Sequence, residues 1–357
     1  MMVRDFDIVV IGNGFDLHLG LKSSFEDFFK KHLFVNGVFA NNSNNLLYEL
    51  IYYKFYCEDL GRGGFIKKLG LSSINWMDIE KFLKEIATNK TLIDTIFKCY
   101  SHKDENRFPG TFDRKMIACS LLLKNRKLPS DEGIEIIHKI LKDDLFGFKD
   151  DFASYLKKQI EGKVGYNLSQ KQFLKKLLST LPNFSASGLI QIINFNYSTI
   201  DGNNYIEANI QGLLNNDIVI GYDSSMSSID ESDVFELSKE WQKIGINYYY
   251  QYPNKEDRIK NIIFYGHSLG EQDYPYFFEV FDSCDLLAKD CCVKLYFCYS
   301  EFGDEQKRIE SLTKYKMNIS KMLNAYERYR EPGKQRNMIV SKLKMKKRVL
   351  LVNIEDE

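Results

Sequence analysis

Charge excess of one sign, paired cysteines and long apolar stretches are all missing from this chain of 357 residues. Lys plus Arg and Asp plus Glu number 49 each, so the whole protein has no electrostatic bias toward nucleic acid or an anionic membrane. No uninterrupted apolar run approaches the ~18 residues that a membrane-spanning helix needs. The first residues also lack the basic-then-apolar pattern of a secretory signal. These absences predict a cytoplasmic protein with neither a membrane nor a nucleic-acid partner.

The cysteines give no sign of a metal site or a disulfide framework. There are seven, an odd number, and no two of them follow the C-x-x-C spacing of zinc-binding pairs. Cys291, Cys292 and Cys298 lie in or beside an apolar, strand-like run. We therefore expect these three to be buried, reduced thiols, and we expect no metal.

What the sequence does contain is a series of short apolar strands separated by helical segments, in a chain that is 44% hydrophobic. Apolar residues three and four apart dominate between the first strand and the second, as in residues 76–86 and 150–178. This alternation predicts an α/β fold with a Rossmann-like parallel sheet and a large helical insertion. The strands are expected at residues 6–12, 189–197, 208–212, 217–221, 261–266 and 293–298.

The same pattern predicts a discontinuous nucleotide-binding core made of residues 1–35 and 186–300. Residues 36–185 form the helical insertion, and residues 301–357 form a C-terminal helical and basic extension. Between positions 334 and 348 that extension carries seven Lys or Arg and no acid. Aromatic residues do not interleave with these charges, so a solvated basic face explains them better than a nucleic-acid patch.

The most informative stretch is the first strand and the glycine loop that follows it. Gly12-x-Gly14 leads from the strand into a helix, which brings backbone N–H groups to a place where a phosphate can bind. Leu17 stands where a dinucleotide fingerprint needs its third glycine, and the next glycine is Gly20. Ligand approach and close packing explain the glycines about equally well. Asp16, near the start of the helix, is assigned capping slightly ahead of catalysis.

A second glycine motif, Gly-His-Ser-Leu-Gly at residues 266–270, fits the nucleophile elbow of α/β-hydrolases. That chemistry needs a histidine base that follows the serine in the chain. The last of the five histidines is His267, so Ser268 has no base in the expected order. We therefore expect no esterase activity.

Loops rich in Gly, Asn, Ser and Asp follow several of the expected strands. They span residues 12–20, 194–198 and 266–273, and residues 209–212 add a fourth. Ligands of open α/β sheets bind outside the carboxyl ends of the strands. The four loops together indicate a ligand site more strongly than any one of them.

Three motifs stand in this order along the chain: Gly12-Asn-Gly-Phe-Asp16 with Gly20-Leu21 and Phe25, then Trp76-x-Asp78-x-Glu80, then Gly266-His-Ser-Leu-Gly-Glu-x-Asp273. Together they resemble the AbiH family of bacteriophage abortive-infection proteins, from the N-terminus to about residue 300. The family implies antiphage defence in which the infected cell is sacrificed, and it leaves a phage-derived trigger and self-association open.

A more distant likeness is to sirtuin-type NAD-binding domains, and it implies NAD as the ligand. The loop Gly12-x-Gly14-Phe15-Asp16-x-x-x-Gly20-Leu21 is similar to the sirtuin Gly-Ala-Gly-Ile-Ser-x-x-x-Gly-Ile. Phe195-Asn196-Tyr197-Ser198 looks like Gln-Asn-Ile-Asp, and Gly266-His-Ser-Leu269 is similar to Gly-Thr-Ser-Leu. In this likeness the insertion replaces the zinc domain. The implied cofactor contacts are Gly12, Asn13, Gly14, Phe15, Gly20, Tyr197, Gly266, His267, Ser268 and Asp273.

The likeness ends at the catalytic histidine, because this chain has Gln211-Gly212 where sirtuins have His-Gly. A glutamine amide can orient a ribose or a water but cannot accept a proton as a base. The implied catalytic residues are Asp16 as the substitute carboxylate, Asn196 and Gln211, with Glu80 and Asp273 as outside candidates. An NAD glycohydrolase and a nucleotide sensor that acts through a partner both stay open. A nucleic-acid toxin that uses the basic segment has weaker support.

Overall fold

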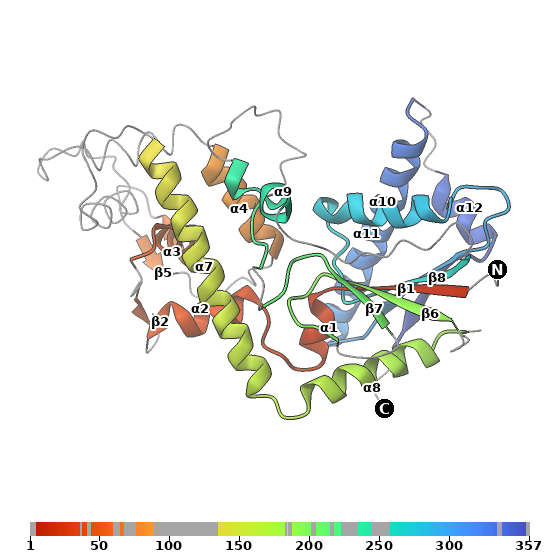
Figure 1. Cartoon of the computed structure of the whole chain (residues 1–357), viewed down its shortest axis with the longest axis horizontal. Coiled ribbons are helices and arrows are strands. Elements are labelled where there is room, and N and C mark those ends of the chain that lie inside the picture. The colour runs from red at the N-terminus through yellow and green to blue at the C-terminus, as the bar shows by residue number, and fades with distance from the viewer. Residues whose placement is uncertain are drawn as a thin grey trace, which may run out of the picture. The chain divides into compact units, whose positions relative to one another are not determined.

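The structure is a computed structural model. It describes residues 5–35, 38–40, 44–59, 65–67, 76–88, 135–182, 184, 188–200, 205–214, 218–222, 235–244, 258–333 and 338–354. The chain divides into two compact units (Figure 1). The first, here called the sheet unit, comprises residues 1–21, 163–213 and 248–357, and the second, the helical unit, comprises residues 22–162 and 214–247.

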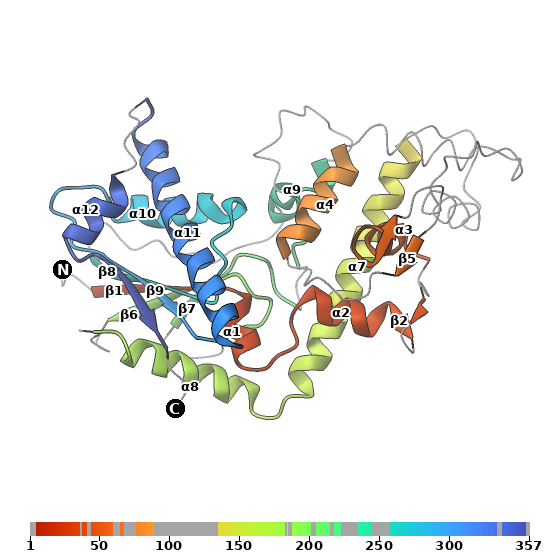
Figure 2. The same cartoon turned by 180° about the vertical axis from the view of Figure 1, so that it is seen from behind.

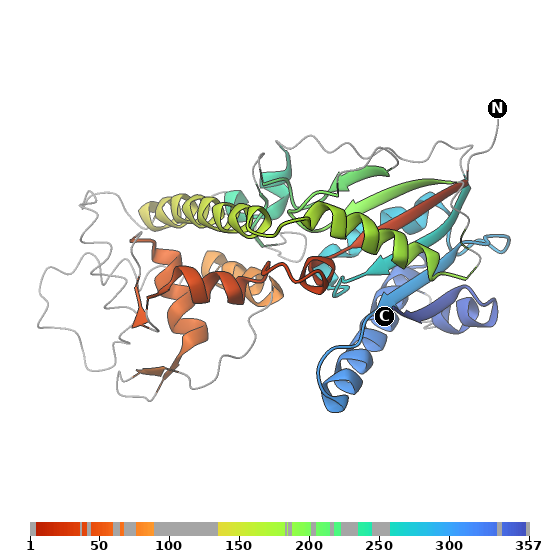
Figure 3. The same cartoon turned by 90° about the horizontal axis from the view of Figure 1, so that it is seen from below.

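The sheet unit is built on six parallel strands in the order β10-β9-β8-β1-β6-β7. Figure 3 shows the red β1 between the green β6 and the teal β8. In β1 every residue from Phe6 to Ile11 is buried, as expected for a central parallel strand covered on both faces. The predicted Rossmann-like α/β class is confirmed. The strands are β1 (Asp5–Ile11), β6 (Leu189–Asn194), β7 (Tyr205–Asn209), β8 (Arg258–Tyr265), β9 (Lys294–Tyr299) and β10 (Val349–Asn353).

Helices cover both faces of this sheet (Figures 1 and 2). Along β1, Val9 and Ile11 pack with α8 (Tyr166–Ser179), while Ile8 and Val10 face a core that contains residues of the other helices. The period of two along the strand thus supplies two separate hydrophobic cores. The helices on the second face are α10 (Tyr274–Ser283), α11 (Glu305–Arg330) and α12 (Ile339–Met345).

The helical unit has an aromatic core. Phe28 contacts Phe148 and Phe152 with ring centroids 5.8 and 5.2 Å apart, and Phe25 lies 4.7 Å from Phe152. Its helices are α2 (Phe25–His32), α3 (Leu46–Ile51), a π-helical turn (Tyr52–Tyr56), α4 (Trp76–Thr88), α7 (Glu135–Glu161) and α9 (Lys239–Ile244). Two short hairpins join Phe34–Val35 with Val38–Phe39 and Cys57–Asp59 with Phe65–Lys67.

Three segments fall on the other side of the expected domain boundaries. Residues 22–35 belong to the helical unit, whereas α8 belongs to the sheet unit, where it covers one face. Residues 301–357 are no separate extension, because β10 pairs with β9 and α11 covers the second face. The apolar strand β10 follows the basic segment near position 340 directly, and the composition of that segment did not indicate it.

The strand expected at 217–221 is wrong. Residues 218–221 are buried but form no strand, and Tyr222 makes a single bridge to Ser238. A buried apolar run satisfies the same pattern without joining a sheet, since the pattern reports burial and not pairing.

The expectation that the cysteines near β9 are buried holds only for Cys298. Cys292 is exposed and Cys291 is half-buried. Both precede the strand, in the loop before β9, so the burial of the strand does not extend to them.

Among the described helices, none is both long and apolar enough to cross a membrane.

Candidate functional site

The structure brings the four predicted loops together at the carboxyl edge of the sheet. β8, β1, β6 and β7 are neighbours, and backbone hydrogen bonds continue from their ends into the loops. Gly12 N donates to Tyr265 O at 3.1 Å, and Phe195 N donates to Ile11 O at 2.9 Å. Ile210 N donates to Asn194 O at 2.8 Å, which ties the loop after β7 to the end of β6.

The glycines of the first loop are needed for packing against the loop after β8. A Cβ at Gly12 would lie 2.7 Å from the His267 Cα, and one at Gly14 would lie 2.7 Å from the Gly266 Cα. Gly14 N donates to Gly266 O at 2.8 Å, and Phe15 N donates to Gly12 O at 2.8 Å. The N–H groups of Gly12, Gly14 and Phe15, which the loop was expected to offer to a phosphate, are therefore already bonded within the protein. Phe15 itself is fully buried.

The helix that follows is short, and Gly20 ends it. α1 spans Asn13–His18, with Asn13 as its first residue, and Gly20 adopts φ +73°. Gly20 N donates to Leu17 O, so the left-handed turn supplies a hydrogen bond to a carbonyl of the last helical turn. The next helix, α2, begins separately at Phe25.

Asp16 lies inside α1 and is not its cap. Gly12 occupies the N-cap position, and the Asp16 carboxylate, only 3% exposed, accepts hydrogen bonds across the unit. The Tyr166 hydroxyl donates at 2.6 Å and the Ser198 hydroxyl at 2.8 Å. Burial raises the pKa of Asp16 to about 6, since the loss of water outweighs the two hydroxyl bonds. The capping interpretation is wrong, and the side chain titrates close to neutral pH.

Two further polar side chains near Asp16 and Ser198, those of Tyr166 and Gln170, come from α8. Tyr166 stays protonated, because burial and then the neighbouring Asp16 raise its pKa. Gln170 is fully buried and its Nε2 donates to the Ser198 Oγ at 3.4 Å, while its Oε1 has no partner. We call Asp16, Tyr166, Gln170 and Ser198 the carboxylate cluster. Sequence reasoning missed both α8 residues, since nothing local links a helix residue to a loop 150 positions earlier.

Asn196 is the one predicted site residue whose whole side-chain amide is buried and unbonded. The residue is 3% exposed, and neither Oδ1 nor Nδ2 has a hydrogen-bond partner in the structure. Its backbone N–H donates to the Asn194 Oδ1 at 2.8 Å, which fixes the loop. The next residue, Tyr197, is also buried. On the adjacent strand end, Gln211 is buried with an unpartnered Oε1.

His267 holds the loop after β8 in shape. Its Nδ1 accepts the Leu269 N–H at 2.9 Å, and its Nε2 faces the Asp273 carboxylate at 3.4 Å. Both ring nitrogens are thereby engaged within one loop, and Leu269 is held at φ +56°. Ser268 is exposed, and its carbonyl accepts a hydrogen bond from Asn318. The histidine thus orders the loop and is not placed to serve Ser268 as a base.

A cavity of about 210 Å³ opens beside these loops. Ligand pockets commonly reach about 300 Å³ or more, so this one fits a single ring system better than a whole dinucleotide. Asp16, Asn196 and Gln211 do not line it. The lining comes from the loops after β1 and β8, from the end of β9 and from α11: Gly14, Tyr265, Gly266, His267, Cys298, Tyr299, Ser300, Glu301, Phe302, Arg308, Ser311, Leu312 and Tyr315.

The remaining outside candidate, Glu80, lies in the helical unit. There its carboxylate forms an ion pair with Lys239, and both side chains are largely buried. Within the described part of the chain, no group of three His, Cys, Asp or Glu side chains is placed to hold a metal ion.

Comparison with known protein families gives one result. The family model described as bacteriophage abortive infection AbiH matches residues 8–294. In comparisons with curated proteins and with solved structures nothing matches, and the sirtuin likeness gains no support. Since the matched span covers the first strand, the helical insertion and most of the sheet, this chain belongs to the AbiH family of bacteriophage abortive-infection proteins.

Proposed function

We propose that this abortive-infection protein binds NAD or a related nucleotide at the carboxyl edge of its sheet. The observation that carries this proposal is the unbonded, buried amide of Asn196. An unpaired buried amide costs about 1–3 kcal/mol, so such a group is retained where something is gained from it.

The amide matches the chemistry of the proposed ligand. An asparagine side chain offers one acceptor and two donors, the complement of a nicotinamide carboxamide or of an adenine edge. Gln211 adds a second free acceptor, its Oε1, on the neighbouring strand end. The cavity beside Gly14 and Gly266 has room for one ring of the ligand.

Hydrolysis of the ligand is a second candidate function, and Asp16 is the observation that favours it. A carboxyl group with a pKa of about 6 is mostly ionised at neutral pH and is a stronger base than an ordinary carboxylate, which suits a general base. In this reaction water attacks the ribose carbon, the bond to nicotinamide breaks, and Asp16 takes the proton of the water. NAD and water then give nicotinamide, ADP-ribose and a proton.

The basic segment gives the toxin alternative no further support. Arg348 is buried, and Lys342 pairs with Glu327, so two charges of the basic segment already make contacts within the protein.

The test of binding is the thermal midpoint with and without NAD, ADP-ribose or nicotinamide. A ligand that binds only the folded state raises the midpoint of the wild-type protein. We expect this shift to disappear in Asn196→Ala and to persist in Asn324→Ala, which removes a half-buried amide on α11. Equal shifts in both variants, or none with any of the three compounds, would refute binding through Asn196.

The test of turnover is the release of nicotinamide from NAD. Asp16→Asn keeps the shape of the side chain but cannot accept a proton, so a hydrolase loses release while ligand binding persists. Wild-type protein that binds NAD without releasing nicotinamide is a sensor.

A further inference from the structure

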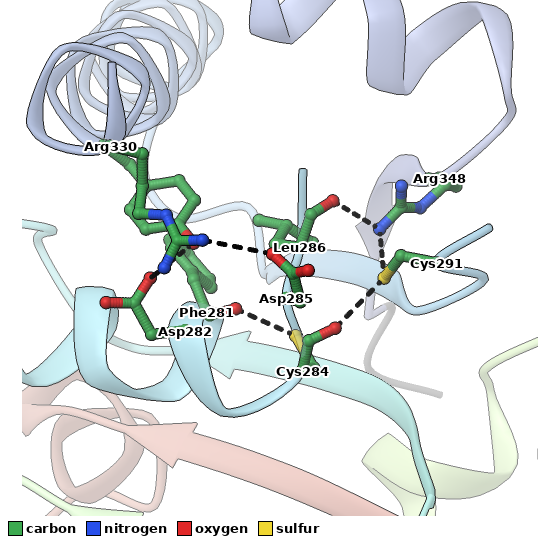
Figure 4. A network of polar contacts seen from close by, with 9 residues as sticks. Phe281, Asp282, Cys284, Asp285, Leu286, Cys291, Arg330 and Arg348 are labelled. Carbon is green, nitrogen blue, oxygen red and sulfur yellow. Dashed lines mark hydrogen bonds and ion pairs between the residues drawn. The ribbon is translucent and has the colours of Figure 1, made fainter. Parts of the chain in front are cut away.

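A second cluster of ionisable groups lies at the opposite, amino edge of the sheet. Cys284 follows the last turn of α10, Cys291 lies in the loop before β9, and Arg348 directly precedes β10. Figure 4 shows the Arg348 guanidinium reaching toward the Cys291 sulfur and the Leu286 carbonyl. We call Cys284, Cys291 and Arg348 the thiol–arginine cluster.

Arg348 is a buried cation without a carboxylate. Its side chain belongs to a residue that is 5% exposed, and it donates to Val293 O at 2.8 Å and Leu286 O at 3.1 Å. Its third contact is the Cys291 Sγ, 2.9 Å from Nη2. Among the described residues no acidic side chain bonds it. A guanidinium stays charged in proteins, and buried charges require compensation. Among its hydrogen-bond partners in the described residues, the Cys291 thiol is the one ionisable group.

The two cysteines are neighbours in the structure. The Cys291 Sγ lies 3.4 Å from the Cys284 carbonyl oxygen, and the Cys284 Sγ donates to the Phe281 carbonyl at 3.3 Å. The Cys284 thiol, together with the Val293 backbone and the Arg348 guanidinium, holds the pKa of Cys291 below its usual value. The Cys291 side chain, and then burial, raises the pKa of Cys284. A protonated Cys291 would donate to the Cys284 carbonyl, but the short contact with Arg348 favours the thiolate.

We propose that Cys291 and Cys284 form a reversible disulfide when the protein meets a hydroperoxide. A half-buried thiolate beside a cation is the reactive form of cysteine, and the protonated thiol of the residue whose carbonyl it contacts is suited to resolve it. This site is independent of nucleotide binding, since it lies at the other edge of the sheet.

The reaction balances with hydrogen peroxide as the oxidant. The Cys291 sulfur attacks one peroxide oxygen, so an S–O bond forms and the O–O bond breaks. The leaving hydroxide becomes water by taking up the proton that the Cys291 thiol released when it ionised. The Cys284 sulfur then attacks the sulfenic sulfur of Cys291 and the S–O bond breaks. The second water carries away the Cys284 proton. Two thiols and one peroxide give one disulfide and two waters.

Cys292 is the natural control. It is exposed, next to Cys291 in the chain, and in the described part of the structure its Sγ hydrogen-bonds to the carbonyl of Asp290. A reaction governed by exposure would select Cys292, whereas one governed by the guanidinium and the partner thiol selects Cys291.

The experiment treats the reduced full chain with hydrogen peroxide, blocks the remaining thiols with N-ethylmaleimide and maps tryptic peptides. Cleavage after Lys289 separates Cys284 from Cys291, so the disulfide appears as two linked peptides. We expect the loss of two reactive thiols, reversed by dithiothreitol, in the wild-type protein and in Cys292→Ser. In Cys284→Ser we expect dimedone to label Cys291 as a sulfenic acid.

Linkage through Cys292 or Cys298, or unchanged reactivity of both Cys284 and Cys291, would overturn the proposal. The Cys292→Ser protein decides the matter by itself, because Cys291 is then the one cysteine on the peptide 290–294. Cys291→Ser adds the expected absence of linkage where that variant folds.

Discussion

The two edges of the sheet bury opposite charges, and each deals with its charge differently. At the carboxyl edge the Asp16 carboxylate has two hydroxyls and no cation among its described partners. At the amino edge Arg348 has two carbonyls and a thiol and, among its described contacts, no carboxylate.

The difference follows from which group can change its protonation. An aspartate deprived of water takes up a proton, so its pKa rises. An arginine cannot lose its proton, so the neighbouring thiol changes instead: Cys284, the Val293 backbone and the guanidinium together lower the pKa of Cys291. One edge thus has an acid that titrates near neutrality, and the other has an activated thiol.

The largest effect that can break this comparison comes from removing the cation. Arg348→Met leaves two buried carbonyls without their donor, and we expect the free energy of unfolding to fall by about 3 kcal/mol. Arg330→Met is the matched control, because Arg330 pairs with Asp282 and Asp285 at the surface. That substitution costs about 0.5 kcal/mol. Urea unfolding measures both free energies. Equal losses would mean that the buried guanidinium contributes no more to stability than the exposed one, which would contradict the comparison.

A smaller effect is expected from removing a hydroxyl at the other edge. Tyr166→Phe takes the closest donor from Asp16 and should cost about 1–2 kcal/mol. The matched control is Tyr326→Phe, because the Tyr326 hydroxyl donates to Asp282 at 2.7 Å while Arg330 also holds that carboxylate. Since Asp282 keeps its cation, we expect the control to lose less. The same unfolding measurement checks the pair, and a larger loss in the control would contradict the comparison.

The convergence of the candidate loops could be predicted because it needs only local pattern and one topological rule. β1, β6 and β8 are apolar runs bounded by Gly and Asn, and parallel strands end at a common edge. The site's chemistry could not be predicted in the same way. Tyr166 and Gln170 sit on a helix whose pattern reports only its buried face, and their hydrogen bonds to residues 16 and 198 depend on tertiary packing.

The amino edge shows a second reason for failure. The composition of the segment before β10 predicts a basic tail, although Arg348 is buried and the next four residues are apolar. Composition averages over a window, and one buried arginine among exposed lysines has no signature in that average. The thiol–arginine cluster is therefore a product of the fold and not of a motif.

The smallest expected effect is on the pH dependence of stability, and it comes from Asp16. The folded-state pKa of Asp16, about 6, lies above its unfolded value of 3.8, so the folded protein binds more protons between these values. The stability that Asp16 contributes is complete below pH 3.8 and is lost as the pH rises through about 6. Asp16→Asn cannot titrate, so its free energy of unfolding should fall less steeply than that of the wild type between pH 4 and 6. Urea unfolding at several pH values measures the difference. Parallel pH profiles would show that Asp16 is ionised throughout, and the carboxyl edge would then hold a fixed charge just as the amino edge does.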